Sequence, residues 1–158
     1  MSEALFNAIR NQDANEVKSL LSAEPSLVNA RDPRGSTPLL LATYFGSTDV
    51  VNALLEVEQD VDARDGSGNT ALMGVCFKGF TEIARQLIDH GANVNLRNSN
   101  GSSALIFAST FGKTDIVKLL LDKGAETGFK DDRGLTALDH ARMQGMHEIT
   151  TLLEPKKA

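Results

Sequence analysis

The sequence predicts an all-α solenoid, in which short helix-turn-helix units stack in a row and share one continuous core. Two observations predict it: a period of 33 residues runs through most of the chain, and single residue types return at fixed places within that period. A period of this length indicates stacked repeats, because one helix pair cannot bury its apolar side without the next pair. Three columns carry the period most clearly: Gly35, Gly68, Gly101 and Gly134; Leu39, Leu72, Leu105 and Leu138; and Gly46, Gly79, Gly112 and Gly145.

The first unit, at about residues 4–31, departs from this pattern and is expected to be an N-terminal capping repeat. Apolar residues at Leu5, Ile9 and Val17 suit two short amphipathic helices with a break near residues 11–14. Asn15 is expected to cap the second of these helices. A terminal repeat turns one face to water, so departures from the pattern are expected there.

Three full repeats follow, at about residues 32–64, 65–97 and 98–130. In the first of them Thr37 is placed to cap a helix, and Pro38 fits the first helical position, where its missing N–H would be unpaired anyway. Gly46 ends this helix, and Thr48 is expected to open the second one. The segments between repeats contain many turn-forming residues, so we expect hairpin loops that project away from the helices.

The last unit, at about residues 131–153, is expected to be a C-terminal capping repeat, with a poorly ordered polar tail at 154–158. All units would form a single domain, residues 1–158. One position breaks the pattern inside the array, because Glu58 stands where Gly91 and Gly124 stand in the next two repeats. A left-handed backbone at a non-glycine residue is strained by about 1 kcal/mol, so we expect an altered or mobile loop at residues 57–60.

Composition limits the possible partners and the compartment. The formal net charge of -5 argues against nucleic-acid binding, because phosphate recognition depends on clustered Lys and Arg. Cys76 is the single cysteine, so no disulfide within the chain is possible, and a reducing compartment such as the cytoplasm is expected. No signal-peptide pattern opens the sequence, and no apolar run approaches the roughly 18 residues of a membrane span.

Roughly ten columns agree over four copies, and together they resemble the ankyrin-repeat family, whose spacing is also 33 residues. The segment from Asp32 to Gly46 matches the family pattern Asp-x-x-Gly-x-Thr-Pro-Leu-His-x-Ala-x-x-x-Gly best. The resemblance covers nearly the whole chain, and it implies a monomeric, non-enzymatic module that binds a protein partner. One departure is systematic, because the family's usual histidine is replaced in each copy by Leu40, Met73, Ile106 and Asp139.

Partners of ankyrin-like stacks usually meet the loop tips and the end of each first helix. Four of the eight aromatic residues of the chain fall at these helix ends, where they would form a continuous stripe that binds a partner. Alternatively, the rings would only cover the seams between repeats, and both interpretations stay open. The helix-end candidates are Tyr44, Phe45, Phe77, Lys78, Thr110, Phe111, Met143 and Gln144, and the loop-tip candidates are Arg34, Ser36, Ser67, Asn69, Asn100, Ser102, Arg133 and Leu135.

A second pair of columns runs along the loops. Arg31, Arg64, Arg97 and Lys130 form a basic column, followed directly by Asp32, Asp65, Asn98 and Asp131. A basic ridge for an acidic partner is one interpretation. We favour a ladder of exposed ion pairs and loop hydrogen bonds, because the acidic column largely cancels the field.

Other chemistry has weaker signals. Gly66-Ser67-Gly68 superficially resembles a dinucleotide-binding fingerprint, but no parallel strand is predicted before it. The three histidines, His90, His140 and His147, have no partner at metal-ligand spacing, and we interpret them as surface or helix-end residues. Cys76 has no histidine placed beside it, so a small, partly buried interface residue is expected. The sequence therefore predicts no cofactor, no metal site and no catalytic residue.

Two alternatives to a plain binding module remain. The segment from Thr70 to Gly79 resembles small stand-alone bacterial ankyrin-repeat proteins, some of which are exported and linked to catalase-dependent peroxide resistance. That resemblance implies an accessory protein of bacterial stress response. A small-molecule-binding protein or an enzyme is the other alternative, and it would need convergent polar groups in a closed pocket.

Overall fold

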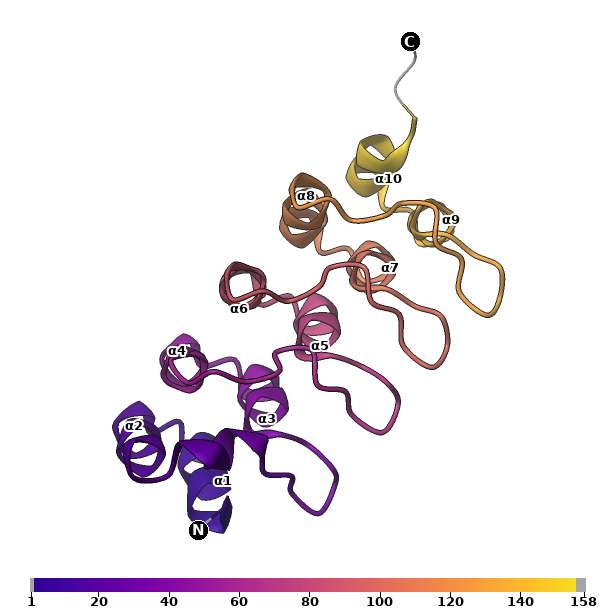
Figure 1. Ribbon diagram of the computed structural model, residues 1–158. Coiled ribbons are helices and arrows are strands. Elements are labelled where there is room, and N and C mark those ends of the chain that lie inside the picture. Colours follow the sequence, from indigo (N-terminus) through magenta and orange to yellow (C-terminus); the bar gives the residue numbers. More distant parts are fainter. Residues whose placement is uncertain (1, 156–158) are drawn as a thin grey trace.

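The computed structural model describes residues 2–155, and within them ten α-helices and one short 3-10 helix form a row of stacked pairs (Figure 1). The predicted all-α solenoid is therefore confirmed. The first helices of the pairs are α1 (Ser2–Arg10), α3 (Pro38–Phe45), α5 (Ala71–Lys78), α7 (Ala104–Thr110) and α9 (Ala137–Met143). The second helices are α2 (Ala14–Ala23), α4 (Thr48–Leu55), α6 (Thr81–Asp89), α8 (Thr114–Asp122) and α10 (His147–Leu153), and the 3-10 helix η1 is Pro25–Asn29.

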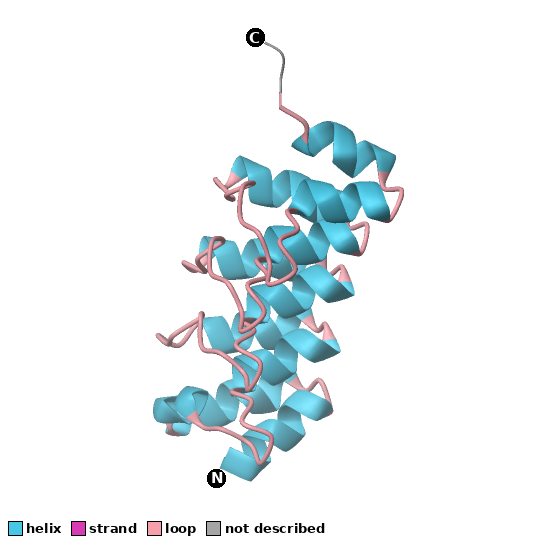
Figure 2. Ribbon diagram, turned by 90° about the vertical axis from the view of Figure 1, so that its right-hand side faces the viewer, coloured by secondary structure: helices cyan, strands magenta, loops and turns pink. Residues whose placement is uncertain are grey.

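The helices lie in two layers, with the first helices in one and the second helices in the other (Figure 1). The hairpin loops leave the layer of first helices and project to the side away from the second helices, as expected. Figure 2 shows the same stack after a quarter turn, with the long hairpin loops at the left and centre and short turns at the right-hand ends of the helices. Residues 156–158 of the expected polar tail lie outside the described residues, and the repeat boundaries themselves stay a prediction.

The first helices α3, α5, α7 and α9 each begin directly after a threonine or serine, because the hydroxyl accepts a hydrogen bond from a free backbone N–H. Thr37 accepts from the amide of Leu40, and Thr70, Ser103 and Thr136 do the same in the other repeats. Two caps of the second helices differ from the prediction. The cap of α2 is Asp13 and not Asn15, and that of α4 is Ser47 and not Thr48, because each helix begins one residue or more earlier than expected.

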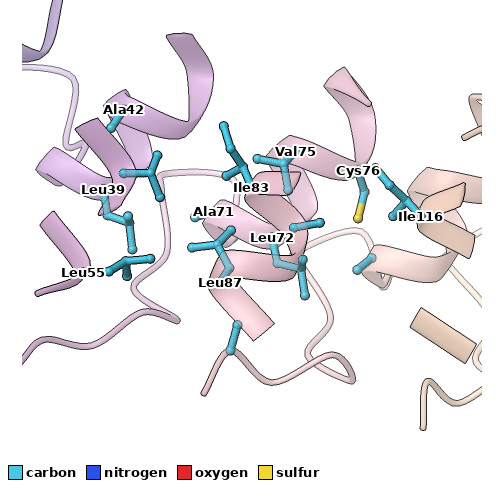
Figure 3. Packing of buried hydrophobic residues seen from close by; sticks show 14 of the residues in the cluster. Leu39, Ala42, Leu55, Ala71, Leu72, Val75, Cys76, Ile83, Leu87 and Ile116 are labelled. Carbon is cyan, nitrogen blue, oxygen red and sulfur yellow. The ribbon is translucent and has the colours of Figure 1, made fainter. Parts of the chain in front are cut away.

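The core runs without interruption from the first pair of helices to the last. Figure 3 shows part of it, where Leu72 and Val75 of α5 pack among buried side chains of the neighbouring helices. Both side chains are at most 2% exposed. A buried side chain of this size stabilises the fold by about 1.5–3 kcal/mol relative to its exposed state, so the pairs hold one another in place.

The loop that follows α4 is altered relative to its counterparts, which is one of the two outcomes expected for residues 57–60. Within residues 2–155 the one non-glycine residue with a positive φ lies between α1 and α2, so Glu58 avoids the left-handed backbone that would be strained at a non-glycine residue. In the next repeat the backbone amide of Ala92 donates to the Leu87 carbonyl. Here the side-chain amide of Gln59 donates to the Leu54 carbonyl at 2.6 Å instead. The loop is altered, and a side chain replaces the glycine-dependent closure.

Candidate functional site

Each hairpin loop is held in its shape by hydrogen bonds from backbone amides to one acidic or amide side chain. The Asp32 Oδ1 oxygen accepts hydrogen bonds from the backbone amides of Arg34 and Ser36, both at 2.9 Å. Asp65, Asn98 and Asp131 accept the equivalent pairs in the later loops. The turn is completed by a left-handed glycine, and at Gly68 (φ +77°) a side chain would also collide with the amide of Ser99 at 2.9 Å.

The three arginines of the basic column donate to carbonyl groups and not to carboxylates. The Arg64 guanidinium donates to the Gly68 carbonyl of its own loop at 3.0 Å and to the Arg97 carbonyl of the next repeat at 2.6 Å. Arg31 and Arg97 repeat this arrangement one unit away on either side. The predicted loop hydrogen bonds are therefore confirmed, and the predicted ion pairs with the neighbouring acidic column are wrong, because the guanidinium groups donate to loop carbonyls instead.

The loop-tip candidates fall into two groups. Arg34, Ser67, Asn100 and Arg133 are exposed at the tips. Ser36, Asn69, Ser102 and Leu135 are half-buried, and their backbone amides close the turns. The side chain of Asn69 also accepts a hydrogen bond from the Asn98 amide at 2.8 Å, so it links two neighbouring loops.

The helix-end candidates form the most apolar exposed surface among residues 2–155. Five large apolar side chains lie in solvent here, and we call them the aromatic stripe: Tyr44 (60% exposed), Phe45 (37%), Phe77 (49%), Phe111 (42%) and Met143 (58%). None of these side chains is interior. The rings of Phe77 and Phe111 meet edge to face at 4.7 Å across the boundary between two repeats.

The polar helix-end candidates differ in whether their side chains already make contacts within the protein. The ammonium group of Lys78 lies 4.2 Å from the centre of the Tyr44 ring, a cation–π contact between repeats. The Thr110 hydroxyl donates to the Ile106 carbonyl at 2.7 Å, so it is occupied within its own helix. Gln144 is exposed and follows the last residue of α9.

A groove between α3 and α5 was not predicted from the sequence. Its volume is about 690 Å³, and its floor includes Leu40, Leu41 and Gly74, with Tyr44 and Phe77 at the helix ends. Tyr44, Phe45 and Phe77 of the aromatic stripe thus border a common hollow with the first two hairpin loops. We call the surface that the stripe and the loops form with the first helices the concave face. The missed signal was Gly74, which stands in the column of Leu41, Phe107 and His140.

The cysteine and the histidines lie apart from one another. Cys76 is fully buried, more than expected, and burial raises the pKa of its thiol far above the ordinary value. His90 follows α6 with its ring nitrogen Nδ1 2.8 Å from the Gln86 carbonyl, and His147 is exposed at the start of α10. Within residues 2–155 no three His, Cys, Asp or Glu side chains converge as metal ligands.

His140 is a correction to the expectation of surface histidines. Its ring is only 12% exposed, and its Nε2 lies 2.6 Å from the Asp131 carboxylate oxygen Oδ2. Burial of Asp131 acts to raise the pKa of that carboxyl, but hydrogen bonds from His140 and from the amides of Leu135 and Arg133 lower it below its ordinary value. The pair fastens the last hairpin loop to α9, which is a structural role.

At two of the four positions where the family usually has histidine, the side chain found here accepts a hydrogen bond from the backbone amide of the capping threonine. The Asp139 carboxylate accepts a hydrogen bond from the Thr136 amide at 3.0 Å, and this bond lowers the pKa of the Asp139 carboxyl. The Met73 sulfur lies 3.5 Å from the Thr70 amide as a weaker acceptor. Leu40 and Ile106 have no side-chain acceptor, so the bond is absent in those two repeats.

Comparison with known proteins gives one family. The family model of ankyrin repeats (3 copies) matches residues 2–65 and 72–158. The serine/threonine-protein kinase VIK of Arabidopsis thaliana is 47% identical over 57 residues, which are 36% of this chain and 13% of that kinase. The chain therefore spans only a small part of the length of that relative.

Within residues 2–155 no helix has both the length and the apolar composition that a membrane span requires.

Proposed function

Because the chain belongs to the ankyrin-repeat family, we propose that it is a non-enzymatic module that binds a protein partner through its concave face and its hairpin loops. Ankyrin repeats generally mediate protein–protein interaction, and a stacked array offers a long continuous surface for it. The partner is a protein of unspecified identity, and no cofactor takes part in this proposal.

The observation that supports the proposal is the aromatic stripe. Five large apolar side chains gather at one edge of the concave face, and all of them are between 37% and 60% exposed. Clustered exposed aromatic rings leave apolar surface in water, and that surface becomes favourable when a partner covers it. Aromatic side chains are also the residues that contribute most to binding energy in protein interfaces.

The test removes the rings of the stripe and measures partner capture. We expect the triple variant Phe45→Ser, Phe77→Ser and Phe111→Ser to lose capture of the protein partner in an affinity purification read out by mass spectrometry. We expect it to stay folded, because these side chains are exposed and contribute little to the core. Helical circular dichroism and thermal unfolding check the fold.

A matched control changes three exposed residues on the second helices. Asn15→Ser, Lys18→Ser and Asp122→Ser leave the net charge unchanged and should capture the same partner as the wild type. Undiminished capture by a folded triple variant of the stripe would contradict the proposal. It would leave the second interpretation, in which the rings only cover the seams between repeats, as the better one.

We further propose a monomer in the cytoplasm, formed by one domain with the repeat boundaries given by the 33-residue period. A single buried cysteine suits a reducing compartment. Sedimentation equilibrium that finds a dimer at micromolar concentration would contradict the monomer.

A narrower proposal rests on the segment from Thr70 to Gly79 and its resemblance to small bacterial ankyrin-repeat proteins. In this form the protein is a stress-response accessory that supports catalase-type peroxide defence. A deletion strain would then be sensitive to peroxide, and the wild-type gene would rescue it while the triple variant of the stripe would not. Wild-type peroxide resistance in the deletion strain would reject this narrower form and leave the binding module untouched.

A further inference from the structure

Gly74 has no structural reason to be a glycine. It lies inside α5, its backbone is helical, and a Cβ atom built on it would meet no atom within 4 Å. A glycine inside a helix makes the helix less stable than an alanine at the same position would. Apart from Gly66, which lies in a hairpin loop, the other glycines of the chain have a positive φ or a close neighbour, as Gly46 and Gly68 have both. The missing side chain at Gly74 therefore leaves a hollow that the fold does not need.

The hollow lies on the floor of the groove between α3 and α5. In the repeats before and after, the same position carries the large side chains of Leu41 and Phe107. At Gly74 the space stays open, and Leu41, Tyr44 and Phe77 border the groove around it. Its walls are mainly apolar, so a single aliphatic or aromatic side chain of a partner would lose water there and gain the contacts that Gly74 cannot make.

The rim of the groove favours negative charge. Arg10, Arg34 and Lys78 line it, and none of them takes part in the ion pairs found within residues 2–155. The carboxylates of Asp32 and Asp65 also line it, but each has an oxygen that accepts two backbone amides of its own loop. Lys78 also lies over the Tyr44 ring and Arg10 donates to the Asn7 side chain, but none of the three cations has a carboxylate partner within residues 2–155, so each can pair with an acidic group of a partner.

The distribution of charge over the helices points the same way. The first helices carry the basic residues Arg10, Lys78 and Arg142 against the acidic residues Glu3 and Asp139. The second helices carry Lys18, Arg85 and Lys118 against Glu16, Asp49, Glu82, Asp89, Asp115, Asp122 and Glu148. An acidic partner is therefore repelled from the second helices and accepted on the concave face.

We propose that this groove binds an extended acidic segment of the partner, with one large apolar side chain seated over Gly74 and Asp or Glu residues beside it facing Arg10, Arg34 and Lys78. This inference rests on the proposed function, because it names the partner segment that the concave face accepts. The stripe residues Tyr44 and Phe77 flank the anchor, and the loop residues contact its backbone.

The test uses three fluorescein-labelled pools of nine-residue peptides and fluorescence anisotropy. The first pool has a fixed central Leu with random Asp or Glu around it, the second the same Leu with random Lys or Arg, and the third a central Ser with random Asp or Glu. The first pool should bind about tenfold or more tightly than the other two, since burial of one Leu side chain and favourable charge each contribute on that scale. Its binding should weaken as salt rises.

Two variants of the protein locate the site. Gly74→Leu fills the hollow with the side chain that Leu41 places one repeat earlier, and it should weaken binding of the first pool about tenfold or more. Gly74→Ala should weaken it less and should raise the melting temperature, because alanine favours the helix. Lys78→Gln should weaken binding and flatten its salt dependence, whereas Lys18→Gln on α2 should leave binding unchanged.

Several results would overturn the inference. They are no binding of the first pool at 1 mM, equal binding of the three pools, or unchanged binding by Gly74→Leu in a folded protein. Self-association of the wild type that Gly74→Leu abolishes would assign the hollow to a second copy of this chain and would also overturn it. If peptide binding fails while the triple variant of the stripe still loses its partner, the proposed function stands and only the segment named here is wrong.

Discussion

At the scale of single residues, the pair of His140 and Asp131 joins two parts of the last repeat. Asp131 organises its hairpin loop through two backbone amides, and its second oxygen binds the histidine of α9. In the preceding repeat Asn98 organises the loop with one oxygen in the same way but has Phe107 in the place of the histidine. The charge of Asp131 therefore matters for the histidine, while the loop needs only an acceptor.

Asp131→Asn tests this division of roles. Asparagine keeps the acceptor for the loop amides, but it removes the charge, so we expect a loss of at most about 1 kcal/mol at pH 7. The folded-state pKa of Asp131 is lowered, so the carboxylate stabilises the fold above the unfolded carboxyl pKa of about 3.9, and this contribution is lost as pH falls through the lower folded value. Urea unfolding at pH 7, 5 and 3 should show the two proteins converging at the lowest pH.

The matched control for that series is Asp132→Asn. Asp132 is exposed, and its side chain accepts none of the hydrogen bonds found within residues 2–155. The control should stay within a few tenths of a kcal/mol of the wild type at every pH. A difference between Asp131→Asn and the wild type that is the same at all three pH values would show that the charge of Asp131 contributes nothing.

Residue type predicts exposure well where the repeat fixes the direction of the side chain. The positions of Tyr44, Phe77 and Phe111 were expected at the surface because all three occupy the end of a first helix, and the structure places them there. The hollow over Gly74 could not be predicted in this way. The sequence shows that Gly74 has no side chain. Whether this leaves an empty space depends on the distance from Gly74 to the neighbouring helix and loop.

At the scale of elements, the end of α4 shows how one loop replaces a glycine. The carbonyls of Leu87 and Leu120 accept the backbone amides of Ala92 and Ala125, just after a left-handed glycine. The equivalent carbonyl of Leu54 accepts the Gln59 side chain instead. The sequence indicated that this loop must differ, because Glu58 stands at the glycine position. It did not indicate which residue would supply the donor, since that depends on the path of the chain.

Gln59→Ala tests this closure. The variant leaves the Leu54 carbonyl without its donor, and we expect a loss of about 1 kcal/mol in the free energy of unfolding, measured in urea. Adding Glu58→Gly should recover part of the loss, because glycine permits the left-handed closure that the next two repeats use. Glu58→Gly in the presence of Gln59 should not stabilise the protein further. Equal stability of Gln59→Ala and the wild type would show that water satisfies the carbonyl at no cost.

At the scale of the whole molecule, stability depends on contacts between neighbours. Each helix pair buries its apolar side against the adjacent pair or pairs, and arginine side chains add hydrogen bonds between successive loops. No contact joins the first pair directly to the last, since the two lie at opposite ends of the row (Figure 1). A linear array of this kind unfolds according to the strength of each unit and of each boundary.

Two variants remove the same buried side chain from different places in the row. Leu105→Ala lies in α7, in a unit with neighbours on both sides, and Leu5→Ala lies in α1, in the first unit. Both side chains are at most 1% exposed, so each truncation should cost about 2–5 kcal/mol locally. The central variant weakens boundaries on both sides, and we expect the urea transition to broaden. Hydrogen exchange should then rise first in α7–α10, because the mutated unit has only one unit beyond it at that end and three at the other.

The terminal variant should instead fray α1 and α2 and leave exchange in α5–α10 close to that of the wild type. The contrast follows from the linear arrangement of the units, because a terminal unit has one neighbour and a central unit has two. If both variants shift a single sharp transition by the same amount and raise exchange evenly along the chain, the molecule unfolds as one globular unit. In that case partner binding on the concave face would stabilise every repeat equally. If the units instead unfold separately, partner binding would stabilise most the units that the partner contacts.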